Sequence, residues 1–143
     1  MENMNKPIYT ISAAAELAGI SVHTLRKYEK EGLIIPDKQG NHQRKYDNSD
    51  IERIRCIRHI IRNHKVNIEA IRRFFSHIPC WAITNCSQDE RKHCEAYNGY
   101  FKPCWMLNHD HKSCKDRKCR ECEVYTSFIT CGSIKDKLKQ LII

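Results

Sequence analysis

The sequence predicts a mainly α fold, in which a helix-turn-helix with a small wing precedes a metal-stabilised cysteine-rich module. Short helical patterns with good capping residues fill the first half of the chain, and the cysteines are concentrated in the second half. Residues 1–79 contain one cysteine, Cys56, and residues 80–143 contain eight. This change in composition falls at Pro79, a residue type that tends to end the preceding helix. We therefore place a domain boundary there, with domains over 9–79 and 80–131.

The net charge of the chain indicates which kind of partner it binds. The chain has 143 residues and a formal net charge of +8, from 25 Lys and Arg against 17 Asp and Glu. Such a balance favours a polyanionic partner, either nucleic acid or a membrane surface. No apolar run is long enough to span a membrane, and the start MENMNKPIY lacks a signal-peptide pattern. We expect a cytoplasmic protein, where thiols stay reduced and cysteines bind metal more often than they form disulfides.

The first two helices are predicted from their caps. Residues 1–8 are polar and are expected to be mobile. Ser12 is the predicted N-cap of the first helix, which ends at Gly19 and offers apolar residues to a core. Those apolar residues are Ala15, Leu17 and Ala18.

The second helix, within Ile20–Gly32, is predicted to have an apolar face and a cationic face. Ser21 is its N-cap, Gly32 follows its end, and Val22 and Leu25 face the core. The opposite face carries His23, Thr24, Arg26, Lys27 and Lys30. Groups of this kind reach base edges and phosphates in a major groove, although on this stretch alone a solvated helix is an equal alternative.

A hairpin or wing is predicted next, because Pro36 and Gly40 interrupt the helical pattern before Tyr46. Asp47 and Asp50 then form a capping box for a third helix, and Asn67 caps a fourth. The predicted core positions of these two helices are Ile51, Ile54, Ile57, Ile61, Ile68, Ile71, Phe74 and Phe75. Elsewhere around the third helix we place Arg53, Arg55, Arg58 and Arg62. Cys56 is interpreted as a small buried hydrophobic residue.

From Tyr9 to about Phe75 the chain resembles MerR-family transcription regulators. The resemblance combines YTISAAAELAGISVHTLRKYEKEGLIIP, the wing QRKY and the run DNSDIERIRCIRHI. It implies a homodimer that binds and distorts promoter DNA recognised by RNA polymerase. The DNA-contacting residues predicted from the two-faced helix and this resemblance are Ser12, His23, Thr24, Arg26, Lys27, Tyr28, Arg44, Lys45 and Tyr46.

Two departures from the family pattern matter. Many members have an aromatic residue where this chain has Lys27. Typical members also continue into a long dimerisation helix, whereas here Cys80 follows the fourth helix almost at once. Pairing would then use the cysteine module or the predicted amphipathic helix over 132–143, with Ile134, Leu138 and Leu141 on one face; the alternative is that this helix packs back on the module.

The cysteine module contains an internal repeat, residues 79–97 and 103–125. Both copies open with Pro-Cys-Trp and close with Cys-Glu-x-Tyr. Each copy is too small to fold around a hydrophobic core, so cross-links or metal are expected. The repeat resembles the "two-CW" modules of bacterial signalling proteins. The candidate ligands are Cys80, Cys86, Cys94, Cys104, Cys114, Cys119, Cys122 and Cys131.

Several cofactors fit these thiols. The favoured subset Cys114, Cys119 and Cys122 has the C-x4-C-x2-C spacing of plant-type ferredoxins, with Cys131 or a first-repeat cysteine as fourth ligand. We therefore favour an iron–sulfur cluster (2Fe–2S or 4Fe–4S) over Zn²⁺, which would use the single Cys-x2-Cys pair Cys119/Cys122. A metal-free thiol switch is the third alternative. Trp81 and Trp105 would shield a cluster or simply form the core of the module.

Together these patterns predict a DNA-binding regulator that senses redox state, iron–sulfur status or a metal, and not an enzyme. No nucleotide-binding glycine loop and no acid/base pair support catalysis. Two alternatives remain: a structural zinc site that forms a partner-binding platform, and a DNA-tethered redox or electron-transfer protein.

Overall fold

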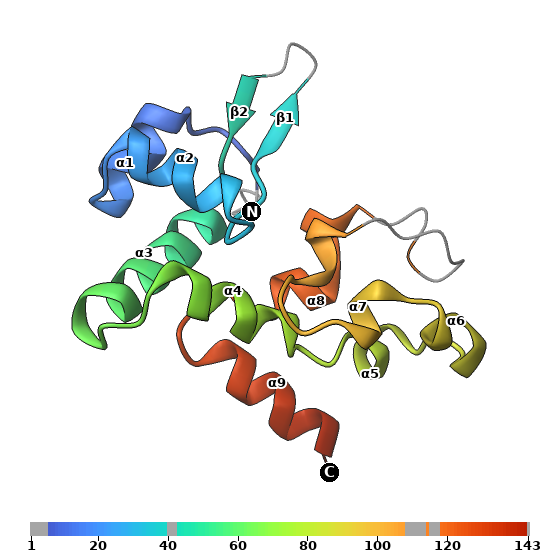
Figure 1. Ribbon diagram of the computed structural model, residues 1–143. Helices are drawn as coiled ribbons and strands as arrows, with labels where there is room; N and C mark the ends of the chain where they lie inside the picture. The colour runs from blue at the N-terminus through green and yellow to red at the C-terminus, as the bar shows by residue number, and fades with distance from the viewer. Residues whose placement is uncertain (1–5, 40–42, 108–113, 115–117, 143) are drawn as a thin grey trace.

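The computed structural model describes residues 6–39, 43–107, 114 and 118–142 (Figure 1). The residues left out are 1–5, 40–42, 108–113, 115–117 and 143, so most of the predicted mobile N-terminus lies outside the described residues. The described fold is mainly helical, as predicted, with one small hairpin. No described helix has the length and apolar character needed to cross a membrane.

The first two helices form the predicted helix-turn-helix. Helix α1 (Ile11–Ala18) ends at Gly19, whose φ of 74° is the left-handed conformation that glycine adopts readily. The predicted N-cap is wrong by two residues, because the hydroxyl of Thr10, not Ser12, accepts the bond from the Ala13 amide. Leu17 is 44% exposed, because the buried face of this helix consists of Ala14, Ala15 and Ala18.

Helix α2 (Val22–Lys30) begins and ends as predicted. The Ser21 hydroxyl accepts a hydrogen bond from the Thr24 amide at 3.0 Å, and Gly32 has a φ of 78° just beyond the last turn. Strands β1 (Asp37–Gln39) and β2 (Gln43–Lys45) then form the antiparallel wing, with Lys38 opposite Arg44. The chain before α1 is held to this wing, since Tyr9 and Tyr46 form a β-bridge.

Helices α3 (Asn48–Asn63) and α4 (Ile68–Ser76) confirm the predicted caps. Asp47 and Asp50 form the capping box, and the Asn67 side chain caps α4. The predicted core positions of α3 are buried except Ile61, which is half-buried. In α4 the core residues are Ile71 and Phe75, whereas Phe74 is 48% exposed.

The cysteine-rich half consists of short helical segments and one longer C-terminal helix (Figure 1). The first repeat forms α5 (Cys80–Thr84), α6 (Gln88–Lys92) and α7 (Glu95–Asn98). The second repeat forms the 3₁₀ turns η1 (Cys104–Met106) and η2 (Cys119–Glu121), then α8 (Glu123–Thr126). Helix α9 (Ser133–Ile142) confirms the predicted C-terminal helix and buries Ile134.

The two halves share one hydrophobic core. Val124, Phe128 and Ile134 from the second half pack in the same buried cluster as Ile54, Ile57 and the other core residues of the helix-turn-helix half. The core therefore continues past Pro79, where the composition of the chain changes.

A disulfide between Cys56 of α3 and Cys131, just before α9, also joins the halves. Cys56 is buried, as predicted, but it is not simply a small hydrophobic residue, because it and the candidate ligand Cys131 form a disulfide. The sequence gives no local signal for this bond, because its two residues are 75 positions apart.

Arg53 is the most unexpected core residue. Its side chain is 1% exposed and does not lie with the other arginines of α3 as predicted. Its Nε donates to the Leu33 carbonyl at 2.8 Å, and its Nη1 donates to the Tyr125 and Phe128 carbonyls, each at 2.7 Å. Four aromatic rings surround its guanidinium, with the Tyr125 ring centre 3.8 Å away. The position was detectable, because residue 53 falls on the same helical face as Asp50, Ile54 and Ile57.

We predict that Arg53→Ala lowers the free energy of unfolding by about 3–5 kcal/mol, because it leaves three buried carbonyls without their donor and opens a cavity among the rings. Denaturant titration followed by circular dichroism measures this change. The matched control is Arg62→Ala, an exposed arginine on the same helix, which we expect to change stability by less than about 0.5 kcal/mol. Equal stability of the two variants would contradict the buried role of Arg53.

Candidate functional site

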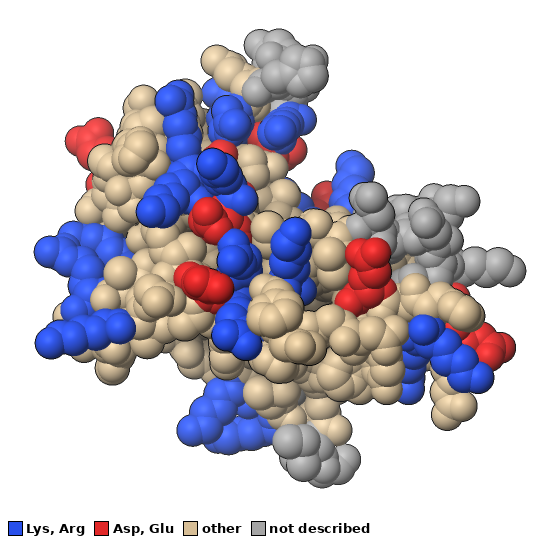
Figure 2. Space-filling model, in the orientation of Figure 1, with Lys and Arg blue, Asp and Glu red and all other residues tan. Residues whose placement is uncertain are grey.

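The exposed face of α2 carries most of the residues predicted to contact DNA. His23, Arg26 and Lys27 are exposed, and Thr24 is half-buried with its hydroxyl 2.9 Å from that of Ser21. Figure 2 shows Lys and Arg side chains gathered in the upper part of this view, where Figure 1 places α2 and the wing. Ser12 is also exposed, in the first turn of α1.

Glu29 holds the wing against α2. Its carboxylate accepts a hydrogen bond from Arg44 Nε at 2.7 Å and another from the Tyr46 hydroxyl. The Glu29 side chain is only 8% exposed, so this ion pair is largely protected from solvent on its acidic side. Arg44 is exposed and Lys45 is half-buried, and both lie on the wing that Glu29 ties to α2.

Two of the predicted DNA contacts are wrong. Tyr28 and Tyr46 are 3% and 0% exposed, respectively, and both lie in the core. Tyr28 falls on the inner face of α2 with Leu25, three positions earlier, and the Tyr46 hydroxyl bonds to Glu29. These tyrosines pack beneath the exposed face of α2 and the wing, so they support that surface and do not form part of it.

Residues 31–36, which we call the connector, join α2 to the wing, and side chains from other segments hydrogen-bond to their backbone groups. The Gly32 carbonyl accepts from Trp105 Nε1 at 2.7 Å, and the Leu33 carbonyl accepts from Arg53. The Ile35 amide donates to the Tyr125 hydroxyl at 2.8 Å, and the Ile35 carbonyl accepts from Arg120 at 2.5 Å. Three of these four bonds come from the cysteine-rich half of the chain.

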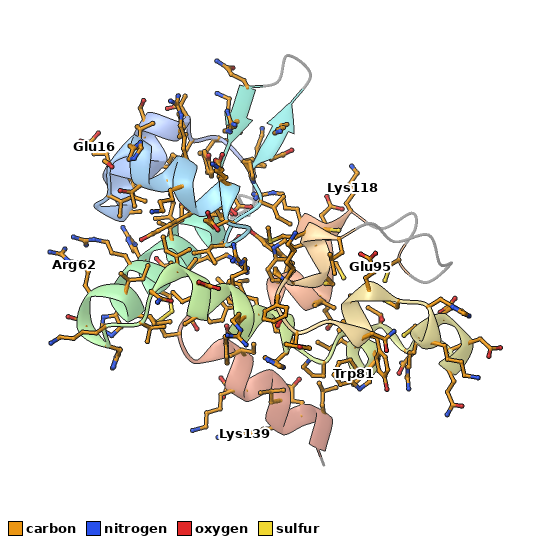
Figure 3. The ribbon with its side chains drawn as sticks, viewed as in Figure 1. Glu16, Arg62, Trp81, Glu95, Lys118 and Lys139 are labelled. Atoms are coloured by element: carbon orange, nitrogen blue, oxygen red, sulfur yellow. A yellow bond between two sulfur atoms is a disulfide. The ribbon has the colours of Figure 1, made fainter. Side chains whose placement is uncertain are left out.

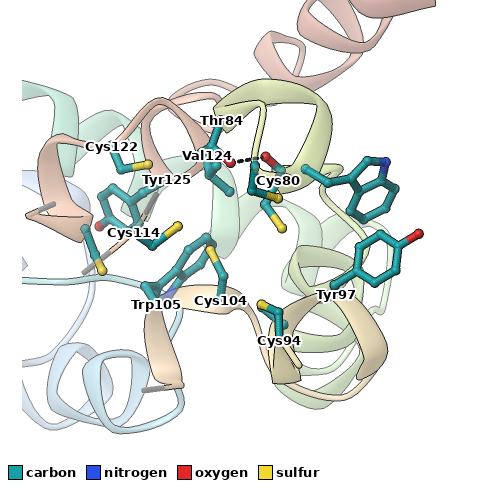
Figure 4. Close-up of a pocket in the computed structure, with 14 residues that line it drawn as sticks. Cys80, Thr84, Cys94, Tyr97, Cys104, Trp105, Cys114, Cys122, Val124 and Tyr125 are labelled. Atoms are coloured by element: carbon teal, nitrogen blue, oxygen red, sulfur yellow. Dashed lines mark hydrogen bonds between the residues drawn. The ribbon is translucent and has the colours of Figure 1, made fainter. Parts of the chain in front are cut away.

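Seven cysteines line one pocket in the cysteine-rich half (Figure 4). They come from both repeats, so the two copies build a single site rather than two. The cavity measures about 30 Å³, which is room for one or two water-sized spheres. The remaining lining residues include both tryptophans, Trp81 and Trp105, and none of the lining side chains is charged. The seven cysteines are Cys80, Cys86, Cys94, Cys104, Cys114, Cys119 and Cys122.

Burial raises the pKa of several of these thiols. The pKa of Cys80 is raised to about 12, first by desolvation and then by repulsion from the neighbouring thiolates of Cys94, Cys86 and Cys114. The same causes raise the pKa of Cys104 still further, and desolvation raises that of Cys119. A reactive thiol switch needs an exposed thiol with a lowered pKa, so Cys80 and Cys104 have the opposite character.

The donor set fits a thiophilic metal group, because the pocket offers thiols from both repeats and no competing charge. The thiols do not form a ready-made centre, however: among the described residues, no three Cys, His, Asp or Glu side chains are grouped closely enough to hold a metal ion. Binding would therefore require the thiols to move inward. Cys131 is excluded from this donor set, since it is bonded to Cys56 outside the pocket.

Sequence reasoning missed four residues that organise these surfaces, namely Glu29, Arg53, Arg120 and Tyr125. Arg120 bonds to Asp47 at 3.0 Å and to Asp50 at 2.5 Å, which anchors η2 to the N-terminus of α3. For Arg120 and Tyr125 no local pattern gives a signal, because their partners are 70 or more positions away.

Comparison with known proteins identifies the first half of the chain. Residues 9–78 match the family model described as MerR HTH family regulatory protein. The match stops just before Pro79, so the family model does not cover the cysteine-rich half. No solved structure gives a significant match to the chain.

Three curated relatives are similar to the chain over part of their length. The first is the "Putative heat shock protein HspR" of Streptomyces coelicolor, which is 37% identical over 67 residues. The second is the "Mercuric resistance operon regulatory protein" of Pseudomonas fluorescens, 39% identical over 59 residues. The third is the "Probable heavy metal-dependent transcriptional regulator" of Haemophilus influenzae, 48% identical over 50 residues. These matches cover 47%, 41% and 34% of this chain and 44%, 40% and 39% of the relatives, respectively. The chain thus spans less than half the length of each of these three relatives.

We predict that Cys80 and Cys104 of metal-free protein react with a maleimide at neutral pH at least about 100-fold more slowly than in the denatured chain, because burial disfavours their thiolates. Mass spectrometry of peptides after timed labelling measures each rate. The same peptides labelled in denaturant are the control. Equal rates in the two conditions would show that these thiols are not buried as described.

Proposed function

With residues 9–78 forming a MerR-type winged helix-turn-helix, we propose that this protein is a DNA-binding transcription regulator whose cysteine pocket receives the signal. The observation that carries the DNA-binding part is the joint arrangement of α2 and the wing. Arg26 and Lys27 are exposed on α2, and Glu29 fixes the wing beside them. A helix with exposed cationic and hydrogen-bonding groups suits the major groove, and basic wing residues suit the phosphate backbone.

The names of two relatives support this reading, since one is a regulatory protein of a mercuric resistance operon and the other a probable heavy metal-dependent transcriptional regulator. We propose double-stranded promoter DNA as the partner, bound by a homodimer and acting on RNA polymerase. Among the described residues no long helix follows α4, so we assign pairing to the cysteine-rich half or α9.

For the signal, we propose a thiolate-bound metal group in the cysteine pocket. The C-x4-C-x2-C spacing of Cys114, Cys119 and Cys122 favours an iron–sulfur cluster, and Zn²⁺ is the alternative. When bound, a cluster would supply sensitivity to oxidants or iron supply, and zinc would supply sensitivity to metal availability. The protein would provide thiols from both repeats, an apolar wall that limits water, and the rings of Trp81 and Trp105.

We predict that Arg26→Ala weakens binding to a selected operator by about 1–3 kcal/mol and has little effect on random DNA, because the loss would fall on a base contact. Lys45→Ala should weaken both equally and reduce the salt slope by about 1, because it would remove a phosphate contact. Fluorescence anisotropy at several salt concentrations, with an operator selected from a random duplex pool, measures both quantities.

The control for charge alone is Arg62→Ala, an exposed arginine in the last turn of α3, away from the wing (Figure 3). We expect it to leave operator affinity within about twofold of wild type. An equal loss on operator and random DNA from Arg26→Ala would remove its assignment as a base-reading residue.

We predict that protein purified anaerobically contains iron and sulfide and absorbs visible light. Cys80→Ser and Cys122→Ser should both reduce the metal content, because the repeats share one pocket, whereas Cys131→Ser should retain it. Elemental analysis, sulfide assay and absorption spectra measure these outcomes. A colourless protein with stoichiometric zinc would show that the pocket binds zinc instead of a cluster. Purified protein that holds no metal and takes none up would exclude both.

A further inference from the structure

The two repeats occupy different environments, although their sequences align. With the closing Cys-Glu-x-Tyr motifs superposed, Tyr97 corresponds to Tyr125 and Lys92 corresponds to Arg120; the opening Pro-Cys-Trp motifs pair Trp81 with Trp105. These pairs allow the contacts of the two copies to be compared residue by residue.

In the second copy all three residues bond to the connector. Trp105 Nε1 donates to the Gly32 carbonyl, the Tyr125 hydroxyl accepts from the Ile35 amide, and Arg120 donates to the Ile35 carbonyl. The connector has little freedom to absorb a shift of these groups, because Leu33 and Ile34 are buried in the core. Met106, next to Trp105, lies so close to Gly32 that a side chain there would collide with it.

In the first copy the corresponding residues face away from the connector. Trp81 and Tyr97 pack edge to face with ring centres 5.2 Å apart, and Figure 3 shows Trp81 well away from α2 and the wing. The Tyr97 hydroxyl points out of the pocket (Figure 4). Lys92 is exposed, and its ammonium group lies 3.9 Å from the carboxylate of Asp89 in the same helix. Within the described part of the chain, neither ring hydrogen-bonds to the helix-turn-helix half.

The second copy also reaches the pocket through residues next to its connector contacts. Cys104 precedes Trp105 directly, and Cys122 begins the turn that carries Tyr125, whose ring lines the same pocket. The rings of Trp105 and Tyr125 are in edge-to-face contact, with centres 5.1 Å apart. A movement of Cys104 or Cys122 toward a shared ligand would therefore act on two of the residues that hold the connector, Trp105 and Tyr125.

We infer that the second repeat is the transmitting copy: Trp105 and Tyr125 carry the state of the cysteine pocket to Gly32 and Ile35, and so set the angle between α2 and the wing within one chain. This inference rests on the proposed function, because it needs a ligand in the pocket and DNA on the reading surface. The first repeat supplies thiols to the same pocket but makes no such contact among the described residues, so its Tyr97 provides a matched control for Tyr125.

The test compares Tyr125→Phe with Tyr97→Phe in the full-length protein. Each change removes one hydroxyl and keeps the ring, but only the Tyr125 hydroxyl binds the connector. Cd²⁺ alone is the probe, because it binds thiolates and its ultraviolet charge-transfer band reports occupancy. Anisotropy gives the operator affinity with and without Cd²⁺, and the ratio of the two affinities is the coupling.

For wild type and Tyr97→Phe we expect Cd²⁺ to change operator affinity by about fivefold or more, in either direction. Tyr125→Phe should bind the same amount of Cd²⁺ with a coupling below about twofold. Trp105→Phe should behave like Tyr125→Phe, because it also removes a hydrogen bond to the connector. By reciprocity, operator DNA should alter the Cd²⁺ affinity of wild type by the same factor and leave that of Tyr125→Phe nearly unchanged.

Two results would overturn the inference and can be told apart. If Cd²⁺ binds and Tyr125→Phe keeps the wild-type coupling, the transmitting role of the second repeat is wrong while the proposed sensor function stands. If wild type binds no Cd²⁺, or its DNA affinity ignores bound Cd²⁺, the proposed sensor function fails, and the inference fails with it.

Discussion

A buried guanidinium needs acceptors for its donors, and the acceptors available to Arg53 lie on both sides of the molecule. One is in the connector, at Leu33, and two are in the second repeat, at Tyr125 and Phe128. If either partner were absent, a charged group would lose its compensation in a low-dielectric environment, which is costly. This single side chain therefore requires the cysteine-rich half to dock on the helix-turn-helix half. The shared core and the ion pairs of Arg120 with Asp47 and Asp50 also join the two halves.

This docking places the cysteine pocket close to the surface that we assign to DNA. Along the chain the two halves are linked through His77, Ile78 and Pro79. The hydrogen bonds instead join the second repeat directly to residues 31–36, between α2 and β1. In a regulator built in this way, the state of the pocket would change the positions of α2 and the wing within one protomer, whichever surface joins two copies.

Local features were predictable from sequence because their physical cause is local. The caps at Ser21, Asp47 and Asn67 depend on a side chain and an amide three residues later, and the end of α1 at Gly19 depends on one left-handed residue. The Cys56–Cys131 bond and the contacts of Arg120 depend on residues 70 or more positions away. Of the candidate site, the exposure of His23, Arg26 and Lys27 followed from the two-faced pattern of α2, whereas the meeting of both repeats in one pocket did not follow from any spacing. The burial of Tyr28 and Tyr46 did not, because a family pattern gives residue identity without exposure.

The Cys56–Cys131 disulfide also has a consequence for the unfolded chain. Its covalent loop encloses residues 57–130, and hence all seven cysteines of the pocket and both repeats. In the chain-entropy view, closing a loop of this length removes about 4.5 kcal/mol of conformational freedom from the unfolded ensemble. When the module unfolds, the segment that carries these thiols stays attached to α3 at both ends. The effective concentration of the thiols for one another therefore remains high, which favours reassembly of the pocket.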